Sequence, residues 1–179
     1  ADLVVVLVDG RPVEAREGSN LLDALQAIGI RVPRLGHDPR LAPTGSCGLC
    51  VVSRRDHDGE LVLACESRVE AGMEVDTSTP AVAAARARRL ATLLPTHALE
   101  CPTCERHGDC RLEDLVHLTG AFDEGPLPVL PRPPREDSWP LIVHDPARCV
   151  ACGLCERLCV EAMGVGAITL ARTDSGSRV

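Results

Sequence analysis

The sequence predicts an α+β protein made of several small domains, and three observations support this fold class. A hairpin, a helix and further short strands occupy the first part of the 179-residue chain, helical segments follow, and ten cysteines fall into three groups. One Phe, one Trp and no Tyr leave Val, Leu, Ile and Ala to build the cores, and these side chains bury less area than aromatic ones. Small aliphatic cores need additional staples, which the cysteines can supply.

The chain opens with a predicted hairpin. Residues 3–8 are a run of Leu and Val (LVVVLV), and Asp9-Gly10 directly after them is a strong signal for a tight turn. The segment 11–17 (RPVEARE) is therefore expected to return as the second strand.

A short helix and three further strands complete the first predicted domain. Ser19 or Asn20 can cap the helix, Gly29 ends it, and its apolar residues keep helical spacing: Leu21, Leu22, Leu25 and Ile28. A long loop then leads to short strands near residues 49–55, 60–65 and 73–78. Together these elements predict a mixed sheet with one helix across it. Their order along the chain is that of a β-grasp ferredoxin.

The second part of the chain is predicted to be mainly helical. A helix is expected to begin at Thr79-Pro80, because proline is favoured in the first turn, and to end before Pro95. Another short helix is expected near RLEDLVHLTG, and residues 125–140, with six prolines and no periodicity, are expected to form an extended connector. We therefore predict four segments: a β-grasp domain at 1–78, a helical domain at 79–124, the connector at 125–140 and a compact tail at 141–179.

Charge and hydropathy exclude several function classes. All 19 basic residues are arginine, and the net charge of −7 argues against a nucleic-acid binder, which needs a basic face. The cluster of Arg86, Arg88 and Arg89 is expected to form the solvated side of a helix. No run of about 18 apolar residues could span a bilayer, and the first residues lack the basic region of a signal peptide. We expect a cytoplasmic protein, alone or on the cytoplasmic face of a membrane complex.

The cysteines are expected to bind metal. In a reducing compartment their spacing favours metal thiolates over disulfides. None lies outside three groups, which are Cys47, Cys50 and Cys65; Cys101, Cys104 and Cys110; and Cys149, Cys152, Cys155 and Cys159.

The last group, CVACGLCERLC, has the C-x2-C-x2-C-x3-C spacing of a bacterial ferredoxin [4Fe–4S] cluster. Ala151 and Gly153 are small enough to let the backbone approach the cluster and point amides at it. In two-cluster ferredoxins the fourth cysteine of such a run binds the other cluster. Either Cys159 completes its own cluster, or a partner or downstream segment supplies a ligand, or the cluster has three ligands; we expect the second arrangement.

The middle group adds a histidine, in the order His97-x3-Cys101-x2-Cys104-x5-Cys110. Three thiolates and one imidazole can hold either a [4Fe–4S] cluster or a structural zinc ion. A neutral imidazole in place of a thiolate leaves a cluster less negative and shifts its potential upward. His107 and His117 are competing ligands, though less well placed.

This one-histidine, three-cysteine run resembles the cluster motif of an iron–sulfur subunit family. The family includes the large iron–sulfur subunit of respiratory complex I, the N-terminal part of [FeFe] hydrogenases, the small diaphorase subunit of NAD-reducing hydrogenases and NAD-linked formate dehydrogenases. Its members carry a β-grasp [2Fe–2S] domain, a histidine-ligated [4Fe–4S] domain and a ferredoxin-like [4Fe–4S] domain, in the order found here. The segments HDPRL and GVGAI are also similar to family sequence. The resemblance implies that all ten cysteines and His97 bind clusters.

In this family the [2Fe–2S] motif is C-x10-C-x2-C with a fourth cysteine later, and Cys47, Cys50 and Cys65 match three of its positions. The position of the first ligand is Gly36, which has no side chain to bind iron. His37 or Asp38 can stand in, a partner can donate a ligand, or the site is empty and the fold is kept as a scaffold. We expect two [4Fe–4S] clusters, together with a [2Fe–2S] cluster that is labile or missing.

These features predict an electron-transfer module that relays electrons between an NAD(P)H or flavin site and a partner catalytic centre, such as a hydrogenase, a formate dehydrogenase or a quinone-reducing module. The implied partners are a flavin- or NAD(P)H-oxidising subunit and a catalytic metal subunit. The module would be a non-catalytic component of an NAD(P)-linked oxidoreductase, since no G-x-G-x-x-G, P-loop or triad-like motif is visible. The alternative is a zinc-stapled structural or interaction protein. The ferredoxin spacing argues against it, because zinc fingers separate two C-x2-C pairs by a longer loop.

Overall fold

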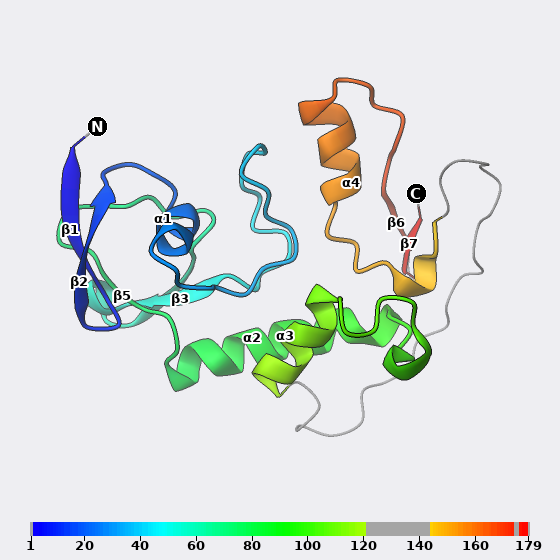
Figure 1. Cartoon of the computed structure of the whole chain (residues 1–179), viewed down its shortest axis with the longest axis horizontal. Helices are drawn as coiled ribbons and strands as arrows, with labels where there is room; N and C mark the ends of the chain where they lie inside the picture. Colours follow the sequence, from blue (N-terminus) through cyan, green and yellow to red (C-terminus); the bar gives the residue numbers. More distant parts are fainter. Residues whose placement is uncertain (1, 121–143, 174–175, 179) are drawn as a thin grey trace. The chain divides into compact units, whose positions relative to one another are not determined.

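The computed structural model describes residues 2–120, 144–173 and 176–178, and the predicted connector at 125–140 lies outside them. The chain divides into two compact units, residues 1–87 and 88–179, which are described separately. Figure 1 shows their helices and strands along the chain. The mixed α+β class predicted from the sequence is confirmed.

The first unit is built on a five-stranded mixed sheet. Its strands are β1 (Leu3–Val8), β2 (Arg11–Arg16), β3 (Val51–Arg54), β4 (Glu60–Leu63) and β5 (Glu74–Asp76), in the order β2-β1-β5-β3-β4. Strand β1 runs parallel to β5, and the other neighbours are antiparallel. Asp9 and Gly10 both have positive φ, 51° and 76°, as a tight hairpin turn with right-handed strand twist requires. The predicted hairpin and mixed sheet are confirmed.

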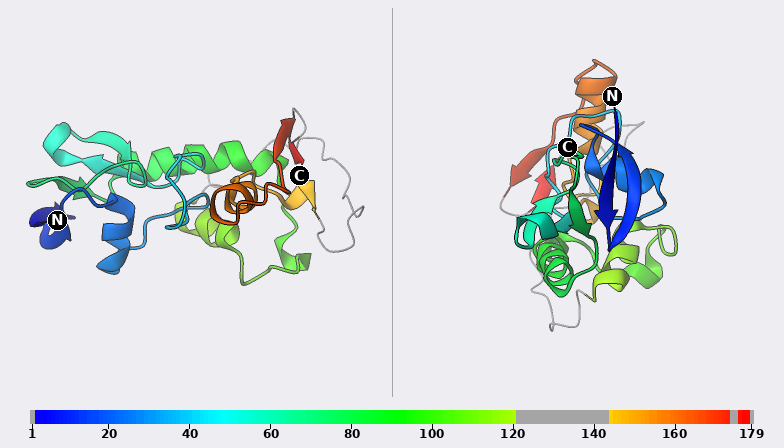
Figure 2. Two further views of the ribbon diagram at one scale, coloured as in Figure 1. Left: turned by 90° about the horizontal axis from the view of Figure 1, so that it is seen from above. Right: turned by 90° about the vertical axis from the view of Figure 1, so that its left-hand side faces the viewer.

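Helix α1 (Leu21–Ala27) lies across this sheet (Figures 1 and 2). Asn20 caps it, because its side-chain oxygen accepts hydrogen bonds from the amides of Leu22 (3.0 Å) and Asp23 (3.3 Å). The buried face of α1 joins sheet residues in one core that includes Leu21, Leu22, Leu25, Val6, Val8 and Val52. The helix is therefore a fixed support for the segments next to it.

Residues 28–50, between α1 and β3, contain no helix or strand and form the long loop that the sequence predicts. The short turn η1 (Arg55–His57) then connects β3 to β4. The loop ends at Cys50, directly before β3, and Cys65 follows β4 by two residues. Since β3 and β4 are hydrogen-bonded neighbours, the sheet brings Cys50 and Cys65 close to each other.

Helix α2 (Pro80–Leu93) begins where the sequence predicts, with the hydroxyl of Thr79 accepting from the amide of Val82 at 3.2 Å. The prediction for its arginines was wrong at one position. Arg86 is only 9% exposed, because it lies between Val82 and Leu90 on the stripe of α2 that is buried, four residues from each. Its guanidinium donates a 2.6 Å hydrogen bond to the carbonyl of Val51.

The second unit holds short elements separated by turns. They are the turns η2 (Leu94–Thr96) and η3 (Cys101–Thr103), helix α3 (Arg111–Thr119), the turn η4 (Pro146–Arg148), helix α4 (Leu154–Arg157) with the π-helical turn η5 (Leu158–Ala162), and the hairpin β6 (Ala171–Thr173) and β7 (Gly176–Arg178). The apolar face of α3, formed by Leu112, Leu115 and Val116, is buried. No helix in the described part of the chain is long and apolar enough to cross a membrane.

Candidate iron–sulfur sites

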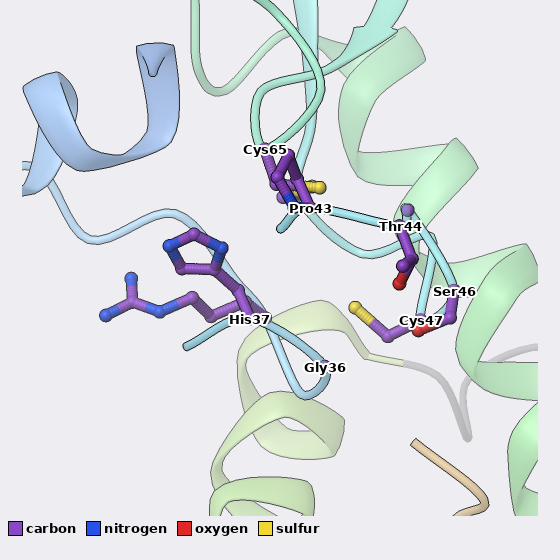
Figure 3. Close-up of a pocket in the computed structure, with 10 residues that line it drawn as sticks. Gly36, His37, Pro43, Thr44, Ser46, Cys47 and Cys65 are labelled. Carbon is purple, nitrogen blue, oxygen red and sulfur yellow. The ribbon is translucent and has the colours of Figure 1, made fainter. Parts of the chain in front are cut away.

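The three cysteines of the first group surround one pocket in the first unit. Cys47, Cys50 and Cys65 line it together with Gly36 and His37, and the cysteines are at most 6% exposed. Figure 3 shows the side chains of Cys47 and Cys65 approaching the same space from two sides, with Gly36 at its edge. The structure thus places the glycine beside the three cysteines, at the position where the resemblance implies a fourth ligand.

Two of these cysteines already contact each other. A hydrogen bond between Cys50 and Cys65 lowers the pKa of Cys65 to about 7 and, together with burial, raises the pKa of Cys50. The amide of Gly45 also donates to Cys65, which favours its thiolate. Gly45 has a φ of 59°, a left-handed conformation that favours glycine, and a Cβ built there would lie 2.7 Å from the Leu63 side chain, which would have to shift.

The two candidate substitutes for the missing cysteine have different surroundings. Arg40 holds the carboxylate of Asp38 through its Nε (2.9 Å), a terminal nitrogen (2.8 Å) and its backbone amide (3.0 Å), and these bonds keep the pKa of Asp38 well below its usual range. The His37 side chain is 6% exposed, and its Nε2 lies 2.8 Å from Oδ1 of Asp23 on α1. The Asp38 carboxylate is therefore occupied by hydrogen bonds from Arg40, whereas His37 lines the pocket.

The middle group occupies the turns around η3 in the second unit. Cys101 begins η3, Cys104 follows its last residue, and Cys110 precedes α3. Burial raises the pKa of Cys101, and the negative charges of Glu113, Cys110 and Cys104 raise it further. The amide of Cys104 donates to the carbonyl of Cys101 at 3.1 Å, so these two cysteines belong to one tight turn. His97 follows η2, where its backbone amide donates to the carbonyl of Leu94.

The competing histidines of this group are differently placed. Nδ1 of His107 lies 2.8 Å from the carboxylate of Glu113, which also accepts a 3.0 Å hydrogen bond from the amide of Gly108. His117 is exposed in the last turn of α3. His97 as the histidine ligand stays a prediction, with His107 and His117 as the competing candidates.

In the last group, backbone amides point at sulfur atoms. The amide of Ala151 donates to Sγ of Cys149 at 3.4 Å, and the amide of Ala167 donates to Sγ of Cys159 at 3.2 Å. Ala151 has a φ of 51°, an uncommon conformation for a residue with a side chain, and it turns the chain sharply inside the cysteine run. Cys155 is exposed, whereas Cys159 in η5 is 5% exposed, so the fourth cysteine has different surroundings from the third.

Within the described residues, no three His, Cys, Asp or Glu side chains are placed to hold one metal ion. A zinc site needs ligand atoms within about 2.3 Å of a single centre. Thiolates that each bind a different iron of a cluster stand further apart, because the cluster itself lies between them.

Sequence reasoning missed two residues that contact the first site. Asp23 hydrogen-bonds His37, and Nδ2 of Asn20 donates to the carbonyl of Cys65 at 2.5 Å. Asn20 was predicted only as a helix cap. No local pattern links either residue to the loop, because their partners lie 14 and 45 positions away in the sequence.

Two family models match the chain. One, a 2Fe-2S iron-sulfur cluster binding domain, covers residues 1–80, and the other, the NADH-ubiquinone oxidoreductase-G iron-sulfur binding region, covers residues 86–123. Together they match the segments that hold the first and the middle cysteine groups.

Known proteins match over nearly the whole chain. The NADPH-Fe(3+) oxidoreductase subunit alpha of Geobacter sulfurreducens is 31% identical over 166 residues, which are 93% of this chain and 20% of that protein. The NADH-ubiquinone oxidoreductase 75 kDa subunit of Reclinomonas americana is 35% identical over 164 residues, which are 91% of this chain and 23% of that protein. The chain thus spans about a fifth of the length of these curated relatives.

A solved structure is also similar. A chain of an NAD+-reducing [NiFe]-hydrogenase in the H2-reduced state superimposes with a TM-score of 0.85 at 29% sequence identity, covering 98% of this chain and 73% of that chain. The likeness extends through the segment that holds the last cysteine group.

Proposed function

We propose, from the premise that the chain belongs to the iron–sulfur subunit family of the complex I 75 kDa subunit and the NAD+-reducing hydrogenases, that it relays single electrons within an NAD(P)-linked oxidoreductase complex. The two matched iron–sulfur domains support an electron-transfer role. In this proposal the electrons enter from an NAD(P)H-oxidising flavin subunit and leave to a catalytic metal subunit. Both partners lie outside this chain, which itself carries no substrate chemistry.

The observation that carries the proposal is the placement of three cysteine groups on loops and turns next to packed helices and strands. We assign the first group, Cys47, Cys50 and Cys65, to a [2Fe–2S] cluster. Two [4Fe–4S] clusters are assigned to the other residues: His97, Cys101, Cys104 and Cys110, and then Cys149, Cys152, Cys155 and Cys159. When bound, such clusters supply one-electron redox chemistry.

The residues of the chain control that chemistry by binding, shielding and hydrogen bonding. The thiolates hold iron, and burial of the first group excludes water from it. Amide donors such as those of Gly45, Ala151 and Ala167 stabilise negative charge on the ligand sulfurs. Each donor makes an added electron easier to accept and so raises the reduction potential.

The alternative function, a zinc-stapled structural or interaction protein, has no support from the comparisons, since both matched domains bind iron–sulfur clusters.

The cellular location of the chain follows from the proposed electron-transfer function. An NAD(P)H-linked partner would place the chain in the cytoplasm or on the cytoplasmic face of a membrane complex.

Iron and acid-labile sulfide analysis of the anaerobically purified chain tests this proposal. Two [4Fe–4S] clusters give about 8 iron atoms per chain, and a [2Fe–2S] cluster brings the number to about 10, with sulfide in equal amount. Cys104→Ser should lower the iron content by about 4 atoms while leaving the other signals in the electron paramagnetic resonance spectrum. A colourless chain with stoichiometric zinc and no sulfide would overturn the proposal in favour of the structural alternative.

A further inference from the structure

We propose that His37 is the fourth ligand of the first cluster, so that three cysteines and one histidine hold a [2Fe–2S] centre at a site where Gly36 offers no side chain. The inference rests on the proposed function, because it takes the first domain to carry a cluster.

His37 lies in the wall of the cysteine pocket. It follows Gly36 directly in the loop, and both residues line the pocket that also contains Cys47, Cys50 and Cys65. Its side chain is 6% exposed, so the imidazole lies inside the fold. An imidazole nitrogen also extends further from the backbone than a cysteine sulfur, which suits a ligand displaced by one residue.

A carboxylate orients the His37 ring. Nε2 lies 2.8 Å from Oδ1 of Asp23, and a carboxylate only accepts, so in the neutral imidazole Nε2 carries the proton and Nδ1 keeps its lone pair. Histidines that bind metals usually donate their other ring N–H to a carboxylate in this way. Figure 3 shows the His37 ring at the pocket that the side chains of Cys47 and Cys65 also approach.

The carboxylate that contacts His37 belongs to a capped and well-packed helix. Asp23 belongs to the first turn of α1, which Asn20 caps and which the buried residues Leu21 and Leu22 anchor to the sheet. Asp23 itself is partly exposed, at 44%, and serves here to position His37. The carboxylate–imidazole pair is therefore held by the core rather than by the loop alone.

The competing ligand Asp38 is already held by another residue. Asp38, the other neighbour of Gly36, is fixed by three hydrogen bonds from Arg40. With His37 as a ligand, a neutral imidazole replaces a thiolate anion, so the centre carries one negative charge less. Its potential should therefore exceed that of a four-cysteine variant, in the direction that histidine ligation produces in Rieske centres.

The test is pulsed electron paramagnetic resonance of the reduced full chain, labelled with 15N only in histidine. A His97→Ala background removes the other predicted histidine ligand. The [2Fe–2S] signal should show strong coupling to a histidine nitrogen, and His37→Ala should abolish the coupling and release about two iron atoms per chain. His57→Ala is the matched control, since His57 lies in the same unit and is exposed, and it should leave the coupling unchanged.

A second variant tests the inference if His37→Ala alone fails to fold. In this variant, Gly36→Cys is added to the His37→Ala chain. The added thiol should restore the cluster without nitrogen coupling and at a lower potential. A wild-type [2Fe–2S] signal without histidine coupling would overturn the assignment of His37. So would an empty wild-type site that Gly36→Cys fills, although both outcomes leave the electron-relay function intact. Absence of iron and sulfide from every variant would instead contradict the proposed function itself.

Discussion

Arg86 places a buried positive charge next to the cysteines of the first unit. It donates to the carbonyl of Val51, the residue after Cys50, while its Nε makes no hydrogen bond. Among the described residues no carboxylate forms an ion pair with it. Burial lowers the pKa of Arg86, and the negative charge of Cys50 acts against that effect. Reduction of a cluster bound at these cysteines would add negative charge. That charge would stabilise the buried guanidinium of Arg86.

Replacing Arg86 should therefore change the reduction potential of the first cluster. We expect Arg86→Met, which keeps the apolar stem and removes the charge, to lower the midpoint potential by several tens of millivolts. A potentiometric titration followed by the [2Fe–2S] resonance signal measures this shift. Arg88→Met is the matched control, because Arg88 is exposed on the same helix. Equal potentials for the Arg86 variant and the wild type would show that the guanidinium does not influence the cluster.

Two glycines of the same pocket differ in what the backbone demands of them. Gly45 has a φ of 59°, in the left-handed region that favours glycine, whereas the φ of Gly36 lies outside that region. The backbone at position 36 therefore accepts an ordinary side chain, and the glycine there is not a requirement of the turn. For this reason Gly36→Cys is a sound experimental variant.

At the scale of elements, α1 has two roles. Its cap residue Asn20 accepts from the amides of Leu22 and Asp23, and the same side chain donates to the carbonyl of Cys65. The helix thus contacts Cys65, a proposed cluster ligand, through its cap and His37 through Asp23. Displacement of α1 should disturb both sides of the first site.

Two substitutions separate the roles of Asn20. Asn20→Ala removes the cap and should lower the free energy of unfolding by about 1 kcal/mol. Asn20→Asp keeps the cap acceptor but removes the donor to Cys65, so it should retain the stability and still speed cluster loss. Urea unfolding of the reduced chain measures the first effect, and bleaching of visible absorption by an iron chelator measures the second. Equal bleaching rates for Asn20→Asp and wild type would mean that the bond to Cys65 is unimportant for retention.

The elements themselves were predictable because their signals are local. Asp9-Gly10, Asn20 and Thr79-Pro80 each specify a turn or a cap from neighbouring residues alone, and the structure confirms each of these. The burial of Arg86 and the contact of Asp23 with His37 were not predictable, since both depend on packing between distant segments. The spacing of the cysteines pointed to clusters, but it could not choose between His37 and Asp38.

At the scale of the whole molecule, three proposed cluster sites lie on one chain of 179 residues that has no nucleotide-binding motif visible in its sequence. Each site is built from its own turns, the first in the sheet unit and the other two in the second unit. Histidine at the first and middle sites would raise their potentials above those of four-thiolate centres. A series of one-electron centres with different potentials is what a relay between a two-electron donor and a separate catalytic centre requires.

A potentiometric titration of the anaerobic full chain, followed by electron paramagnetic resonance, tests this relay most directly. The account predicts three reversible one-electron signals, one of [2Fe–2S] and two of [4Fe–4S] type, with the first dependent on His37 and the second on His97. A chain that contains iron and sulfide but shows no reversible one-electron signal between its oxidised and reduced forms would contradict it.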